Sequence, residues 1–231
     1  MKLRLILVAL GVMAYIAPAQ AQYTYAGRGT GLDVNVLSLV NIRVADTGPL
    51  SPSGGTLAVS AGSANLTSSG ATVVSTGILS SQTVGGAGAV NSFALVNGLR
   101  IFPGIGITPD LVSATVVRSD ASATWGSFGG SSTITSLMVL GSSVTVTGAA
   151  NQIYSIPGVL DLTINRQTVS GGVLRVDALY LSILDPARAG KIAVSTSYAG
   201  LVPEPSSACL VGLALPGILC ITLRRRGRIS A

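Results

Sequence analysis

Histidine is absent from all 231 residues, and its absence excludes most familiar catalytic centres. Without an imidazole the chain holds no Ser-His-Asp or Cys-His arrangement, and it lacks the commonest ligand of zinc and copper sites. The only glutamate is Glu204, so a glycoside hydrolase would have to use a pair of aspartates. We therefore expect a noncatalytic protein without cofactor or metal, in which Asp110 and Asp120 are solvated carboxylates of loops and turns.

Cysteine and charge are also scarce. The only two cysteines, Cys209 and Cys220, lie near the C-terminus, so the residues before them form no disulfide and depend on packing and strand pairing. Six of the fourteen basic residues lie in the two terminal segments, which leaves eight basic against seven acidic residues between Gln22 and Val202. The pI of about 9.8 therefore reflects the chain ends, and we expect no nucleic-acid partner.

The N-terminus has the three parts of a secretory signal peptide. Two basic residues near the start precede an apolar stretch over residues 5–16, and the small residues Ala19 and Ala21 follow it. This order predicts a signal peptide at residues 1–21 that the secretion machinery recognises and signal peptidase removes after Ala21. The exported chain would then begin at Gln22.

The C-terminus contains an apolar segment, Ala208–Leu223, followed by a basic cluster: Arg224, Arg225, Arg226 and Arg228. The arginines would stay cytoplasmic as a stop-transfer signal, so the preceding chain would lie outside the cytoplasm. At about 1.5 Å per residue the apolar segment reaches only about 24 Å, less than the roughly 30 Å of a bilayer core. Pro216 interrupts the predicted helix further. These features predict a temporary transmembrane anchor.

The tripeptide Pro203, Glu204 and Pro205 directly precedes this anchor. Tripeptide, apolar segment and basic cluster in this order resemble the PEP-CTERM sorting signal of exopolysaccharide-producing Gram-negative bacteria. The resemblance implies that residues 203–231 are the signal for an exosortase, a membrane protease or transpeptidase that processes the chain near the tripeptide. The protein would then be cargo that passes from the inner membrane to the cell envelope, cell surface or extracellular biofilm matrix. The alternative is a proline-rich linker before an ordinary membrane anchor.

The body, residues 22–202, reads as one domain made of many short strands. It is rich in Gly, Ser, Thr, Val and Ala, and apolar residues alternate with polar ones over 160–165 and 174–180. Ser170-Gly171-Gly172 predicts the turn of a hairpin between these strands, and residues 192–198 predict a third strand of the same meander. A further strand is expected over 32–36, with a change of buried face after Val36. Gly27–Gly31 is expected to be a flexible lead-in.

Three segments of the body, Gly158–Asn165, Gly171–Tyr180 and Ile192–Gly200, resemble the end of choice-of-anchor P proteins, and the similarity extends back to about Gly31. Members of that family pair one exported domain with alternative C-terminal anchors, of which Pro-Glu-Pro is one. The resemblance implies no catalytic residue. Many members carry cysteines in the body, and this chain has none there, so a family disulfide is not expected.

We therefore expect an all-β protein, a sandwich or partly open barrel of short antiparallel strands, plus the C-terminal transmembrane helix. Its expected function is that of a structural or adhesive component of the envelope or matrix, associated with exopolysaccharide. The alternative is a carbohydrate-binding module. In that case Trp125 and Phe128, beside Gly126 and Gly129, would form an aromatic patch on which a sugar ring stacks.

Overall fold

The computed structural model describes residues 23–36, 40–68, 71–103, 109–184 and 189–203, and one compact unit runs from Thr24 to Val202. Within these ranges no helix has the length and apolar character needed to cross a membrane. The predicted signal peptide and the predicted transmembrane segment, Ala208–Leu223, lie outside the described residues.

Antiparallel strands form two sheets. Sheet A has six strands in the order β12-β13-β14-β15-β1-β2. Its strands are β1 (Tyr23–Val36), β2 (Val40–Asp46), β12 (Gln152–Ile156), β13 (Leu160–Ser170), β14 (Val173–Ile183) and β15 (Gly190–Pro203).

Sheet B has nine strands, and the long strands β7 and β8 form its centre. At one end of the sheet β3, β6, β7, β8 and β9 pair in succession; at the other, β4 and β5 continue from β7, and β10 and β11 from β8. Its strands are β3 (Gly55–Ala61), β4 (Ala64–Ser68), β5 (Ala71–Thr76), β6 (Leu79–Gly86), β7 (Ala89–Ile101), β8 (Val112–Thr124), β9 (Ser127–Thr135), β10 (Met138–Val139) and β11 (Ser142–Ser143).

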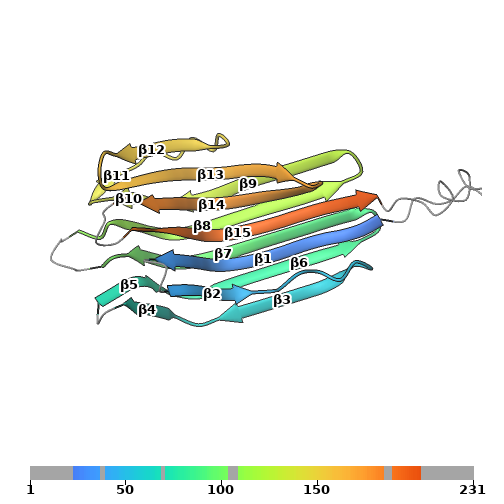
Figure 1. The fold of residues 1–231 in the computed structure, drawn as a ribbon, viewed down its shortest axis with the longest axis horizontal. Helices are drawn as coiled ribbons and strands as arrows, with labels where there is room; N and C mark the ends of the chain where they lie inside the picture. The colour runs from blue at the N-terminus through green and yellow to red at the C-terminus, as the bar shows by residue number, and fades with distance from the viewer. Residues whose placement is uncertain (1–22, 37–39, 69–70, 104–108, 185–188, 204–231) are drawn as a thin grey trace, which may run out of the picture. The chain divides into compact units, whose positions relative to one another are not determined.

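The two sheets pack face to face as a sandwich. β14 lies over β8 and β9, and β2 lies over β3 and β6. Figure 1 shows that the strands of both sheets are aligned along nearly the same axis, with their arrows pointing in alternate directions. The predicted all-β sandwich is therefore confirmed. The prediction of short strands holds for β4, β5, β10, β11 and β12. It was wrong for the longest strands, because β1 and β15 each have 14 residues and β7 and β8 each have 13.

The C-terminal meander is present as predicted. β13 pairs with β14 and β14 with β15, both antiparallel. Gly171 and Gly172, at φ 57° and 76°, form the two-residue turn between the paired residues Ser170 and Val173. Glycine suits this turn because both of its positions need positive φ.

Long strands bury different faces at their two ends. In β14, Leu174 and Val176 point inward, but after Ala178 the inward residues are Leu179 and Leu181. The expectation that alternation would continue to Tyr180 was therefore wrong, because Tyr180 lies on the opposite face from its inward neighbours. A strand alternates strictly only while its backbone stays extended.

Residues in the left-handed region lie opposite these changes of face, on the strands that pair with β14 and β1. Ala45, Asn165 and Ser195 have φ of 52°, 51° and 56°. The register does not slip at these points: the pairs Asp177–Thr196 and Leu179–Val194 remain in step on either side of Ser195. A left-handed residue costs roughly 1–2 kcal/mol, so the surrounding packing must stabilise it. In β1 the change lies at Gly31; the change predicted after Val36 falls outside the described residues.

The sandwich interior is apolar at one end and polar at the other. Leucine, valine and isoleucine fill the first end, whereas small hydroxyl side chains are buried at the second: Ser81, Thr83, Ser92, Ser119, Ser195 and Ser197. The Ser195 hydroxyl donates to the carbonyl of Ala94 at 2.7 Å and accepts from the amide of Ser119 at 2.8 Å. Ala94 and Ser119 face one another across β7 and β8. One side chain of sheet A therefore joins two strands of sheet B.

Glycine lets β1 approach sheet B closely at the polar end. A Cβ on Gly27 would lie 2.3 Å from the Thr83 hydroxyl, and one on Gly29 would lie 2.7 Å from the carbonyl oxygen of Phe93. Both glycines are buried within β1. Gly27–Gly31 is therefore not a flexible lead-in, because the two sheets leave space for backbone alone at this point.

We predict that Gly29→Ala lowers the free energy of unfolding by about 1–3 kcal/mol, because the new methyl group meets backbone that cannot move aside. The matched control is Gly86→Ala in β6, where a Cβ meets nothing within 4 Å; it should change the stability by less than about 0.5 kcal/mol. Urea unfolding followed by circular dichroism measures both values. Equal effects would contradict the close sheet approach.

Candidate functional site

An open groove of about 500 Å³ lies on the outer face of sheet B, over β6, β7, β8 and β9. Gln82, Phe93, Asp120 and Ser131 lie directly opposite one another in successive strands and form its central row. Regular pairing of extended strands places these side chains on one face. The groove thus depends on the sheet and not on a loop.

Arg118 lies over one face of the Phe93 ring in the groove. Its guanidinium carbon lies 4.8 Å from the centroid of the Phe93 ring. Its Nε donates to Asp120 Oδ2 at 2.8 Å and its Nη2 to Asp120 Oδ1 at 2.6 Å. The hydrogen bond to Asp120 raises the pKa of Arg118 above its usual value, so the guanidinium stays charged and fixed. Asp120 lies within β8, not in the loop or turn that the sequence suggested.

The remaining lining is uncharged and combines polar groups with the exposed side chain of Val84. Asn91 and Ser122 face one another across β7 and β8, and Gly129 is opposite Ser122 on β9. A Cβ on Gly129 would lie 2.7 Å from the Ser122 hydroxyl, so glycine keeps this part of the groove open. Because Arg118 and Asp120 balance one another, the groove offers amides, hydroxyls and an ion pair without excess charge. This set suits a neutral ligand with many hydroxyl groups.

Neither of the aromatic residues proposed from the sequence lines this groove. Trp125 lies in the β8–β9 turn with 65% of its surface exposed, and Phe128 in β9 is 41% exposed. Phe128 faces Ala123, which is buried on the inner side of sheet B. The aromatic patch at these two residues therefore stays a prediction, separate from the groove. Sequence analysis missed Phe93, although the inward alternation of residues 90–96 leaves it on the outer face.

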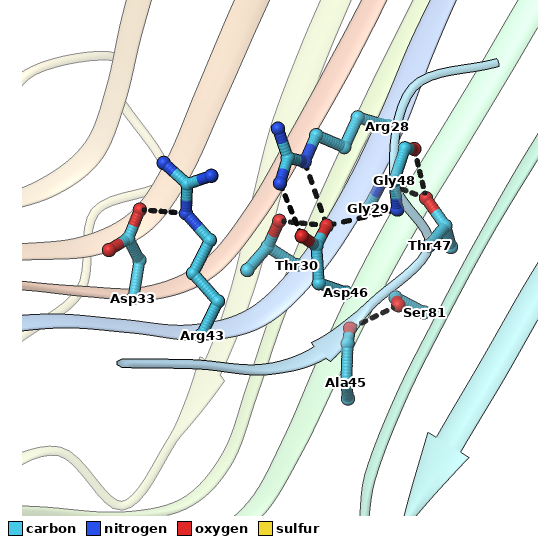
Figure 2. Close-up of polar contacts among 10 residues, drawn as sticks. All are labelled: Arg28, Gly29, Thr30, Asp33, Arg43, Ala45, Asp46, Thr47, Gly48 and Ser81. Atoms are coloured by element: carbon cyan, nitrogen blue, oxygen red, sulfur yellow. Dashed lines mark hydrogen bonds and ion pairs between the residues drawn. The ribbon is translucent and has the colours of Figure 1, made fainter. Parts of the chain in front are cut away.

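The outer face of sheet A carries the densest polar cluster (Figure 2). Asp46 ends β2 and lies opposite Thr30 of β1. Asp46 Oδ1 accepts from Arg28 Nε at 2.7 Å, from the Thr30 hydroxyl at 3.1 Å and from the Gly48 amide at 3.1 Å. Arg28 Nη2 donates to Asp46 Oδ2.

This cluster holds the chain as it leaves β2. The Gly29 amide donates to the Thr47 hydroxyl at 3.0 Å, and below it the Ser81 hydroxyl of sheet B donates to the Ala45 carbonyl at 2.5 Å. Hydrogen bonding from Arg28 lowers the pKa of Asp46 below its ordinary value and raises that of Arg28. The cluster is satisfied internally, which favours a structural role.

A second cluster surrounds Asp177, whose side chain is fully buried although it lies on the outer face of sheet A. Asp177 Oδ1 accepts from Arg175 Nε at 2.9 Å and from the Thr196 hydroxyl at 2.7 Å. Arg166 Nη1 lies 3.8 Å from Oδ2, and the Arg166 guanidinium carbon lies 3.8 Å from the centroid of the Tyr180 ring. The two arginines cover the carboxylate and shield it from water.

Arginine also pairs with Asp110, which was considered from the sequence, and with Asp33. Asp110 pairs with Arg100 at 2.8 Å, and Asp33 pairs with Arg43 at 3.1 Å. In the part of the chain that the structure describes, no three Cys, Asp or Glu side chains gather in a way that could hold a metal ion. The carboxylates are thus used in ion pairs within the fold.

A second hollow of about 430 Å³ lies where the start of β1 meets the loop after β2. Tyr25, Leu50 and Tyr198 line it, with Arg28 at its side. Burial raises the pKa of Tyr198 above its ordinary value, so this hydroxyl stays protonated at neutral pH. The lining is mainly apolar and offers fewer polar groups than the groove on sheet B.

Pro203 ends β15, whereas Glu204, Pro205 and the arginine cluster lie outside the described residues, as do Ala19 and Ala21. No protein-family model matches the chain, and neither a curated protein nor a solved structure matches it. The site is therefore interpreted from its own geometry.

We predict that Asp46 contributes stability that depends on pH. Its pKa is lowered in the folded chain, so its contribution is complete above its unfolded pKa of about 3.9 and disappears as the pH falls through the lower folded value. The difference in free energy of unfolding between wild type and Asp46→Asn should thus be constant near pH 6 and shrink below about pH 4. Urea unfolding at each pH measures this difference.

The control is Asp161→Asn, because Asp161 is exposed in β13. Its difference from wild type should stay near zero over the same range. An Asp46→Asn difference that grows in acid would contradict the assigned ion pair.

Proposed function

We propose that the chain is an exported, noncatalytic β-sandwich protein of the Gram-negative cell envelope or extracellular matrix, sorted and processed through a PEP-CTERM signal at residues 203–231. In this proposal signal peptidase acts after Ala21 and an exosortase acts near Pro203. The sandwich is the cargo, and the apolar segment holds it temporarily in the inner membrane. Its resemblance to choice-of-anchor P proteins belongs to the same proposal.

The observation that carries the proposal is the position of the compact unit. It runs from Thr24 to Val202, so its ends fall beside the two proposed processing points. Removing residues before Gln22 and after the Pro-Glu-Pro tripeptide would leave its strands and core essentially complete. A processing signal has to leave a stable product, and these boundaries are compatible with one.

A noncatalytic role is supported by the use of the carboxylates. Asp33, Asp46, Asp110, Asp120 and Asp177 each pair with arginine. A hydrolase built on aspartates would need two of them facing one another across a cleft at about 5–10 Å. Pairing with arginine suits cohesion of the sheets better than proton transfer.

We predict that the protein from its native host loses mass from both ends. Intact mass spectrometry should give a chain that begins at Gln22 and ends near Pro203, whereas a strain without its exosortase should retain residues up to Ala231. An identical C-terminus in both strains would contradict exosortase processing and favour an ordinary membrane anchor.

Carbohydrate binding is a second candidate function, and the groove on sheet B favours it. The groove combines Phe93 with amide, hydroxyl, guanidinium and carboxylate groups in a solvent-open site without excess charge. Hydroxyl-rich sugars bind through such hydrogen-bonding groups and through apolar contact with an aromatic ring. A neutral exopolysaccharide is the ligand class that fits best.

We predict that Phe93→Ala weakens binding to the exopolysaccharide of the native host by roughly tenfold, the value of one aromatic contact. Affinity electrophoresis in gels containing that polysaccharide measures the change. Trp125→Ala is the matched control and should leave binding within about twofold of wild type, because Trp125 does not line the groove. If Trp125→Ala weakened binding and Phe93→Ala did not, the sugar would bind at the predicted patch of Trp125 and Phe128. If the wild-type protein did not bind, only the structural role would remain.

A further inference from the structure

Two edge strands of sheet B, β3 and β9, lack the usual protection against pairing with another chain. Exposed edge strands carry unpaired amides and carbonyls, and proteins usually guard them with charged residues, prolines, bulges or short length. No charged residue lies between Asp46 and Arg100, or between Asp120 and Asp161. Among the described residues, β3 pairs only with β6 and β9 only with β8. Both strands lie within these uncharged stretches.

The other outer strands are better protected. β2 carries Arg43 and Asp46, and β12 has only five residues. β4 contains a register shift between Leu66 and Thr67, and β10 and β11 have two residues each. The longest regular unprotected edge is therefore β9, with nine residues and neither charge nor proline.

Sheet A fixes the position of β9. Gln167 of β13 donates from its Nε2 to the Gly130 carbonyl at 2.9 Å, and a Cβ on Gly130 would lie 2.8 Å from the Val176 side chain. This contact occupies one edge carbonyl, so the segment from Ser131 to Thr135 offers the better continuous edge. A strand held in place binds a partner with a smaller loss of entropy than a mobile one.

We propose that a second copy of this chain pairs with β9 through its own β9, antiparallel and about a two-fold axis. A row of main-chain amides and carbonyls is complementary to an identical antiparallel row. If the two copies were related by translation instead, β9 of one copy would lie beside β3 of the other. Those two strands run in the same direction, because four antiparallel pairings separate them. Parallel pairing is less stable, and two-fold dimers are the commonest oligomers.

This proposal does not depend on export or on polysaccharide binding. The test uses the full-length chain in mild detergent, with the dimer dissociation constant measured by analytical ultracentrifugation. Ser131→Lys with Thr133→Lys places like charges across a β9–β9 junction and should raise that constant at least about tenfold. Ser131→Glu with Thr133→Glu should do the same. An equimolar mixture of the lysine and glutamate chains should form a heterodimer, because opposite charges then meet.

The matched control changes the other free edge. Ala58 and Ser60 of β3 lie in the same cross-strand rows as Ser131 and Thr133. Ala58→Lys with Ser60→Lys therefore adds the same charge at the same level of the sheet, but on the opposite edge. It should leave the dimer intact. Thermal melting verifies that every variant is folded. A wild-type chain that stays monomeric at about 100 μM, a mixture that does not dimerise, or equal loss with the β3 variant would overturn the proposal.

Discussion

The close approach of β1 to sheet B is the constraint on which the rest of the sandwich depends. Where Gly27 and Gly29 face Thr83 and the backbone of Phe93, no large side chain fits between the sheets. Small residues with hydroxyl groups are therefore buried beside these glycines, and hydrogen bonds offset the cost of burying several of them, as between Thr83 and Ser92. Ser195 likewise joins Ala94 and Ser119.

This close approach explains why long strands change the face they bury. At the apolar end of the sandwich, Leu32 and Val34 of β1 point inward. At the polar end, where β1 approaches sheet B closely, the inward positions of β1 hold Gly27 and Gly29. In a strictly alternating strand, residues an odd number of positions apart point to opposite faces. Gly29 and Leu32 are three positions apart, so they could not both point inward. The change of face in β1 lies at Gly31, and the left-handed residue Ala45 lies opposite it on β2 without a slip in register.

Part of this fold could be predicted from the sequence, and the reasons for the misses are physical. The β13–β14 hairpin was readable because Leu160, Leu162 and Ile164 alternate with polar residues and Gly171-Gly172 suits a tight turn. The first half of β1 was missed, because a glycine-rich segment resembles a loop unless the opposing sheet is known. Ala45 and Ser195 gave no signal of positive φ. Phe93 and Arg118 lie on neighbouring strands, and only pairing brings them together.

Charge is distributed differently over the two outer faces. On sheet A, arginines neutralise Asp46 and Asp177 within the fold, so that face has little capacity left to bind a ligand. On sheet B, long uncharged stretches supply β3, β6 and β9, and the groove contains only the balanced pair Arg118 and Asp120. An uncharged polar surface repels neither a neutral polymer nor an identical copy. Binding and association are therefore expected on sheet B, while sheet A stabilises the fold.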